Sequence, residues 1–590
     1  MKPSRRFLAL LLALGLGAGA VSAHLSAQVR KPGQPLPPEP KQQQAEEPFA
    51  DTVNVSVVNV DVYVTDKQGN PVSGLTKDDF EIFENKRPVE ITNFYAVSNG
   101  KAVSQPEPPP PVTAEAPGAP AVPAQVQALE AVRTPEDQRL RLIVYIDNFN
   151  LRPFNRNRVV RELRAFIGQK LGREDQIMLV TYDRELHIRV PFTSDPGLIA
   201  AALNDLEKIS AQGVHADSER REAMDRIEES QSVVEAENYA RTYAESTYND
   251  LAFSINALKK LTDSLAGMPG RKAVVYVSDG LPMIAGQDVF YAVQSKYGEQ
   301  STSLVKTLQY DVSRRLTELA AQANSNRTTF YTIDAAGVRV YESTQASERG
   351  HATAAGLTQI VESVRFSNLQ STLQLMAEKT GGMAVINTNT FMPALERMAR
   401  DFSSYYSLGY QPSHFGDGRY YKIEVRVKGR KDLQVRHREG YRDKNVEARM
   451  NDGTIAALNF PFEQNPLGVI MEFGQPKRRD DGFYLVPVVV RIPIGKLVLV
   501  PREQTQSEDA RVRLFIAAID SNGSTSDVQN IPVPISVPKA DVATAVNKFY
   551  TYSVNLLMRS GEQRVAVGVR DDVAAAESFV SRGLRVGTGR

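Results

Sequence analysis

The feature that most constrains this chain is the alternation, across residues 139–406, of short apolar runs with amphipathic segments of helical length. Runs such as LRLIVYID, DQIMLVTYD and KAVVYVSDG are apolar almost throughout, which is typical of strands that are buried on both faces. The segments between them, such as NRNRVVRELRAFIGQKL, repeat their apolar residues with the period of a helix. The alternation predicts a doubly wound, mainly parallel sheet that helices cover on both sides.

One pair of runs departs from this pattern. In VTYDRELHIRV, two strand-like halves meet at Asp183 and Arg184 with almost no chain between them. Parallel neighbours need a crossover of a dozen or more residues, so such a short connection joins antiparallel strands. We therefore expect one antiparallel strand in the otherwise parallel sheet.

Two acidic residues follow the buried runs at the end where such sheets bind ligands. Asp147 comes directly after LRLIVYI, and Asp279 follows KAVVYVS. A buried carboxylate needs a partner. The pair could share a Mg²⁺ or Ca²⁺ ion, or each carboxylate could brace its own turn without a metal. A third option is neutralisation by an arginine, the candidates being Arg152, Arg156 and Arg158.

β-rich segments flank the region 139–406. Residues 53–98 contain alternating valines with one phase slip, which predicts a bulged strand, and residues 407–445 read as a hairpin. The hairpin either completes a β-sandwich begun by 53–98, with the α/β region inserted, or packs separately. Residues 455–590 carry recurring strand patterns and an Asn522-Gly523 turn, and predict one immunoglobulin-like β-sandwich.

These motifs resemble a known family. The first strand with its aspartate, the YVSDG ending and the antiparallel hairpin are similar to the von Willebrand factor type A domain. Two further stretches look like the secreted, VWFA-related proteins of the acidobacterial type. They are VDVYVTDKQGNPVSGLTKDDFEIFENKRPVEITNF and YYSLGYQPSHFGDGRYYKIEVRV. The resemblance covers roughly residues 53–442.

The resemblance implies a metal-ion-dependent adhesion site, with a D-x-S-x-S first loop, a threonine in a second loop and an aspartate in a third. Asp147 and Asp279 match the two aspartates, but Phe149 and Leu151 stand at the hydroxyl positions, and no clear Gly-Thr pair follows. The implied metal site is therefore degenerate. Its predicted ligands are Asp147, Asn150 and Asp279, for Mg²⁺ or Ca²⁺.

The resemblance also implies that this rim binds another protein or an envelope macromolecule. The rim residues expected to contact the partner are Asn148, Phe149, Leu151, Arg152, Gly280 and Pro282. For Phe149 and Leu151 the alternative is packing beneath the loop. A highly charged helical segment begins near residue 215 and is either a solvated arm or a second contact surface.

The N-terminus predicts export. Residues 1–23 have a basic start, an apolar run and small residues before Ala23, as in a cleaved signal peptide, and residues 24–52 and 99–138 are Pro-rich linkers. We expect a periplasmic or extracellular protein with no transmembrane segment in the mature chain. The formal net charge of +1 argues against binding to nucleic acid.

Common catalytic signatures are missing from the sequence. It has no cysteine, no phosphate-binding loop, no G-x-S-x-G elbow and no H-E-x-x-H. We therefore expect an exported, non-enzymatic binding or adhesion protein. Two alternatives stay open, a hydrolase of cell-envelope polymers and a purely structural module of an envelope assembly.

Overall fold

The computed structural model describes residues 57–98, 101–103, 139–170, 175–339, 352–460, 462 and 464–587. The chain forms two compact units, Ser56–Phe460 and a second one that holds Pro461–Arg590. The predicted signal peptide and the linker 24–52 lie outside the described residues, as does most of the linker 99–138. Within the described ranges, no helix has both the length and the apolar content needed to cross a membrane.

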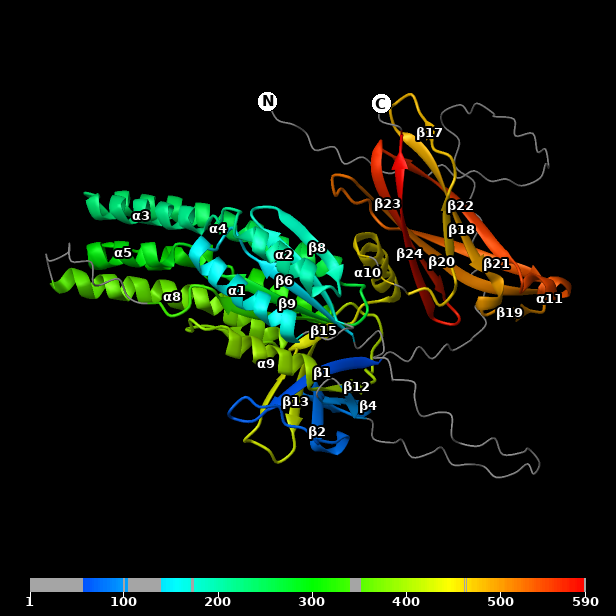
Figure 1. Ribbon diagram of the computed structural model, residues 1–590, viewed down its shortest axis with the longest axis horizontal. Helices are drawn as coiled ribbons and strands as arrows, with labels where there is room; N and C mark the ends of the chain where they lie inside the picture. The colour runs from blue at the N-terminus through cyan, green and yellow to red at the C-terminus, as the bar shows by residue number, and fades with distance from the viewer. Residues whose placement is uncertain are drawn as a thin grey trace, which may run out of the picture. The chain divides into compact units, whose positions relative to one another are not determined.

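The first unit contains a six-stranded sheet in the order β11-β10-β9-β6-β7-β8 (Figure 1). All neighbours pair in parallel except β7 and β8, which form an antiparallel hairpin with Arg184 at a positive φ of 78°. The mixed α/β class and the antiparallel strand are therefore as predicted. The strands are β6 (Leu140–Ile146), β7 (Gln176–Tyr182), β8 (Leu186–Thr193), β9 (Arg271–Ser278), β10 (Thr328–Asp334) and β11 (Ala384–Val385).

Helices lie on both faces of this sheet. In β6, Leu142, Val144 and Ile146 share one core with α1 (Pro153–Lys170), α2 (Pro196–Leu206) and α9 (Met392–Ser403). Ile143 and Tyr145 point to the other face, because successive strand residues alternate, and they are also buried. On that side run α4 (Val233–Ser264), α5 (Gln287–Tyr297), α7 (Ser313–Ser325) and α8 (Ala352–Thr380). Burial on both faces explains why the strands read as continuous apolar runs.

Several helices are too long to end with the sheet. Helix α4 has 32 residues and is about 48 Å long, whereas a strand of eight residues spans about 27 Å. Figure 1 shows α3 (Gly213–Glu229), α5 and α8 continuing past the strands next to α4. The charged segment that begins near residue 215 therefore forms part of a helical projection from the carboxyl rim of the sheet.

The β-rich segments on either side of the α/β region form one domain. Strand β1 (Val58–Thr65) pairs with β12 (Tyr405–Tyr410), and β2 (Phe80–Glu84) pairs with β13 (Tyr420–Val427). Apolar residues of all four strands share one core. The hairpin segment therefore pairs and packs with the N-terminal β-rich segment, on either side of the α/β region in the sequence. The remaining strands are β3 (Arg87–Val89), β4 (Ile91–Ser98), β5 (Lys101–Val103), β14 (Gln434–His437) and β15 (Gly440–Arg442).

Two boundaries differ from the prediction. Residues 101–103 pair with β4 as strand β5, so the linker expected from residue 99 begins later. Helix α10 (Val446–Asn459) occupies the start of the segment expected to be β-rich from residue 455, with Asn445 capping its first turn. Neither element has the strong periodicity that would reveal it from sequence.

The second unit consists of two antiparallel sheets. One contains β16 (Ile470–Phe473), β17 (Lys477–Arg478), β18 (Tyr484–Pro493) and β22 (Phe549–Met558). The other contains β19 (Val500–Arg502), β20 (Ser507–Asp520), β21 (Gln529–Pro538), β23 (Gly561–Asp571) and β24 (Ala576–Val586). Valines and leucines of both sheets form a single core. The immunoglobulin-like assignment of this unit stays a prediction.

Candidate functional site

Asp147 directly follows β6 and is almost completely buried, with 1% of its surface exposed. One carboxylate oxygen accepts hydrogen bonds from the Tyr276 hydroxyl at 2.5 Å, the Asn150 amide at 2.9 Å and the Ser278 hydroxyl at 3.2 Å. The other accepts from the backbone N–H of Asn150 at 3.2 Å. Burial raises the pKa of Asp147, and the hydrogen bonds from Tyr276 and Asn150 oppose that rise. Asp147 thus braces the turn that follows its strand.

Asp279 follows β9 and holds the start of helix α1. Its carboxylate accepts from the backbone N–H of Arg152 at 2.9 Å, and the amide of Asn155 lies 3.0 and 2.9 Å from its two oxygens. A carboxylate at a helix N-terminus satisfies free N–H groups and interacts favourably with the helix dipole. Burial raises the pKa of Asp279 to about 6, with Arg152 and Asn155 acting against it.

The two aspartates therefore have separate sets of donors, and the residues do not fit a divalent ion in this arrangement. Asn150 presents an N–H to Asp147, and Asn155 presents one to Asp279, whereas a cation needs oxygen atoms at those points. Phe149 and Leu151 are buried and offer none. Metal binding by Asp147, Asn150 and Asp279 stays a prediction, and the metal-free alternative accounts for every hydrogen bond just described.

The side chains of the three candidate arginines bond to other groups, although the charge of Arg152 still helps to lower the pKa of Asp279. The Arg152 side chain pairs with Asp217 at 2.5 Å. Arg156 donates to Asn148 and to the carbonyl of Ile209. Arg158 donates to the carbonyl of Ala335 and to Asn389.

Sequence reasoning missed a third carboxylate on the same edge. Asp334 ends β10, is fully buried, and pairs with Arg339 at 2.8 Å. Arg339 also donates to the backbone carbonyl of Asp279 at 2.7 Å, so it connects the ends of β9 and β10. The run RTTFYTID ends in an aspartate as the other two strands do, and that repetition was the available signal.

Helices cover the rim instead of leaving it open. A Cβ atom on Gly213, the first residue of α3, would lie 2.6 Å from the backbone of Leu151. A Cβ on Gly280 would lie 2.9 Å from the Leu369 side chain in α8, and Gly280 has a positive φ of 99°. Backbone hydrogen bonds from Gln212 to Asn148 and from Gly213 to Leu151 join α3 to the first loop. Both contacts need glycine, because a side chain would separate the helices from the loops.

This cover corrects the predicted partner surface. Asn148, Phe149, Leu151 and Gly280 are buried and cannot contact a partner in this arrangement. Packing beneath the loop, the alternative for Phe149 and Leu151, is what the structure shows. Arg152 is exposed and Pro282 partly so, and these two remain at the surface.

A small cleft of about 110 Å³ remains between the rim and the covering helices. Its walls include Asn150, Asp279, Pro282 and Arg339, and the helices add Asp217 and Arg365. Asp217 receives Arg365 at 2.7 Å as well as Arg152. Burial raises the pKa of Asp217, but the two arginines outweigh that effect and hold it below its usual value. The volume is below the roughly 300–1,000 Å³ that is usual for small-molecule sites.

No protein-family model matches the chain, and no curated protein matches it. Several solved structures are similar over part of it. BatB from Bacteroides thetaiotaomicron has 13% identity over 45% of this chain and 97% of its own, with a TM-score of 0.22. The von Willebrand factor type A protein from Catenulispora acidiphila has 8% identity over 76% and 66%, with a TM-score of 0.21. The vWF domain of the type V pili tip protein Mfa5 from Porphyromonas gingivalis has 12% identity over 45% and 94%, with a TM-score of 0.23.

At these identities and TM-scores, the likenesses carry no argument about this chain. The class of the domain rests on its own geometry, a mainly parallel sheet with an antiparallel edge hairpin and aspartates at the ends of β6 and β9. That is a type A-like arrangement, as the resemblance implied. Membership in the secreted acidobacterial group stays a prediction.

Proposed function

We propose that the chain is an exported, non-enzymatic binding protein that captures another macromolecule through the helices covering its type A-like sheet. The observation that carries this proposal is the cover itself. Helices α3 and α8 pack against the loops that would otherwise form an open metal rim. Among the described residues, the accessible surface at this end of the domain therefore belongs to the helical projection.

The outer face of α3 is the favoured contact surface. One side of this helix is buried and includes Arg220, Ala223 and Ile227. The other side exposes Glu222, Asp225, Glu228 and Glu229 together with Arg221 and Arg226, a formal excess of two negative charges (four acids less two bases). An acidic, well-anchored helix face favours a partner with a basic patch, because complementary charge speeds association and excludes wrong partners.

Metal independence is part of the proposal. Asp147 and Asp279 are saturated by donors from the chain, so the covering helices and not an ion would supply the contact surface. The cleft that the described residues leave at this rim is smaller than a usual small-molecule site, which supports a macromolecular ligand over a small substrate.

The test is capture from a cell-envelope extract by the immobilised full chain, with bound proteins quantified by mass spectrometry. The double substitution Glu228→Lys and Glu229→Lys reverses charge at the C-terminal end of α3, where lysine suits the helix dipole. Its matched control is Asp480→Lys with Glu562→Lys, two exposed positions in the second unit. A further sample contains EDTA.

We expect the captured proteins to fall at least about five-fold with the α3 variant and to stay unchanged with the control variant and with EDTA. Loss of capture in EDTA would replace this proposal with a metal-dependent one. Equal capture by the α3 variant would show that the contact surface lies elsewhere.

A further inference from the structure

A second cavity lies in the first unit, far from the carboxyl rim in sequence, where the β domain meets helix α9. Its volume is about 460 Å³, which is within the usual range for small-molecule sites. Strands β4 and β12, the turn that follows β1 and the end of α9 form its walls. Its lining includes Val72, Leu75, Phe94, Ala96, Arg400 and Tyr406.

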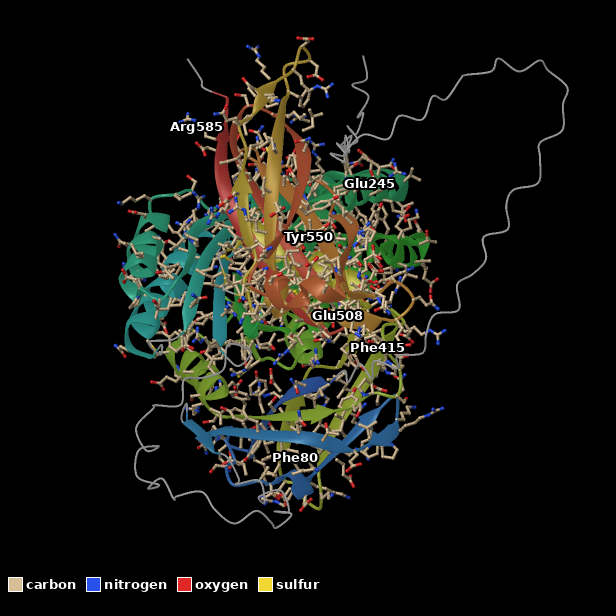
Figure 2. All side chains as sticks on the ribbon, turned by 90° about the vertical axis from the view of Figure 1, so that its right-hand side faces the viewer. Phe80, Glu245, Phe415, Glu508, Tyr550 and Arg585 are labelled. Carbon is tan, nitrogen blue, oxygen red and sulfur yellow. The ribbon has the colours of Figure 1, made fainter. Side chains whose placement is uncertain are left out.

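One wall of the cavity is apolar and rigid. The Phe94 and Tyr406 rings lie 6.0 Å apart, and the Phe80 ring packs 6.2 Å from Phe94 and 5.2 Å from Tyr406. Phe80 is labelled in Figure 2. The Tyr406 hydroxyl donates to the carbonyl of Val72 at 2.8 Å and accepts from the N–H of Leu75 at 3.2 Å. These bonds fix the turn that carries Val72 and Leu75, both partly buried against the same core. The wall is therefore preformed.

Arg400 supplies a positive charge to this cavity. It lies in the last turn of α9, and its Nε atom is buried without a hydrogen-bond partner. Among the described residues, its guanidinium has no ion pair. The adjacent Asp401 pairs with Arg436 instead, and both of its carboxylate oxygens accept from one nitrogen of that arginine, at 2.7 and 2.8 Å. A guanidinium that lines a largely apolar cavity and has no ion pair is a favourable partner for an anion bound there.

We propose that this cavity binds a small molecule with one carboxylate on an apolar body. The guanidinium of Arg400 pairs with the carboxylate, for which its planar donor geometry is suited. The apolar body lies against Phe94, Ala96 and Tyr406. The site belongs to the β domain and its junction with α9, so its function is independent of the capture of macromolecules by α3.

The test uses decanoate and decanol, two molecules with the same chain length and different charge, titrated calorimetrically into the full chain below their aggregation limits. We expect decanoate to bind at least about tenfold more tightly than decanol, because only decanoate gains a charge-assisted interaction with the Arg400 guanidinium. Equal affinities for the two molecules, or no binding of decanoate, would overturn the proposal.

Two variants and a control locate the site. Arg400→Gln should abolish the preference for decanoate and leave decanol binding unchanged. Arg397→Gln, an exposed position one turn earlier on the same helix, should change neither affinity. Ala96→Phe should block both ligands by filling the cavity, provided its thermal unfolding midpoint shows a folded chain. If the preference survives in Arg400→Gln, the charge acts elsewhere and the proposal fails.

Discussion

The amide nitrogen of Asn155 lies within 3.0 Å of both carboxylate oxygens of Asp279, residues that are 124 positions apart in the chain. This contact joins the end of β9 to the first turn of α1 across the edge of the sheet. It also places a hydrogen-bond donor where a metal-binding rim would need a cation. The geometry of this end of the domain therefore depends on an amide and not on an ion.

Removal of that amide should destabilise the first unit. In Asn155→Ala, the partly buried Asp279 carboxylate keeps the N–H of Arg152 but loses its side-chain partner. We expect the free energy of unfolding to fall by about 1–3 kcal/mol, the usual cost of an unsatisfied buried group. Urea unfolding monitored by tyrosine fluorescence measures it. Gln169→Ala, at an exposed position of the same helix, should cost less than about 0.5 kcal/mol.

Asp279 should also give the unfolding free energy a distinct pH dependence. Its folded pKa of about 6 exceeds the ordinary 3.8 because burial disfavours the charged form. The unfolded chain therefore loses this proton first as pH rises from about 4 to about 6, and stability declines through that window. The difference between wild type and Asp279→Asn should show a decline of at most about 3 kcal/mol.

The same pH titration distinguishes a metal-free rim from a metal-binding rim. If Asp279 ligated a cation, millimolar Mg²⁺ would shift its apparent pKa downward, since a bound cation favours the carboxylate. We expect no shift. A clear downward shift would restore the metal site and contradict the metal-free proposal.

The fold was largely predictable because burial on both faces leaves strong patterns in the sequence. Strands β6 and β9 read as continuous apolar runs, and Asp183-Arg184 marked the antiparallel hairpin. The sequence does not predict whether β1 pairs with β12. The two strands lie more than 300 residues apart, and their pairing depends on tertiary contacts and not on a local pattern. Helix α10 was missed for a similar reason, since it mixes polar and apolar residues without a clear stripe.

The site was predictable only in part. Asp147 and Asp279 were correctly placed at the strand ends, but their donors Tyr276 and Asn155 sit within segments that read as an ordinary strand and helix. The cover over the rim depends on Gly213 and Gly280 allowing close approach of backbones. A glycine in the sequence does not show what packs against it. The sequence therefore does not decide whether Phe149 and Leu151 are buried or exposed.

The attachment of α3 should depend on one buried ion cluster. Arg220 bonds Asp288 in α5 and Glu362 in α8, both at 2.5 Å, and its side chain is only 10% exposed. In Arg220→Ala, Asp288 loses this partner and Glu362 keeps only Arg365, at 3.6 Å. Breaking a buried pair in this way typically costs about 3–5 kcal/mol. Hydrogen exchange should show faster exchange in α3 than in α1. The matched control is Arg221→Ala, an exposed position whose side chain bonds, in the described part of the chain, only to Asp217 and Ser218 within α3, and it should leave exchange unchanged.

A histidine should make the β domain sensitive to pH. His414 contacts Asp443 at 2.8 Å and Glu84 at 3.1 Å, so it joins segments from both sides of the inserted α/β region. Burial lowers the pKa of His414, but the two carboxylates outweigh burial and raise it above 6.5. Its stabilising effect is therefore complete below pH 6.5 and is lost as pH rises through the folded pKa. His414→Gln should remove this loss, so its unfolding free energy should differ from wild type more at pH 6 than at pH 9. A difference that stays constant over this range would show that His414 acts only through packing against Tyr421, whose ring stacks on it at 3.5 Å.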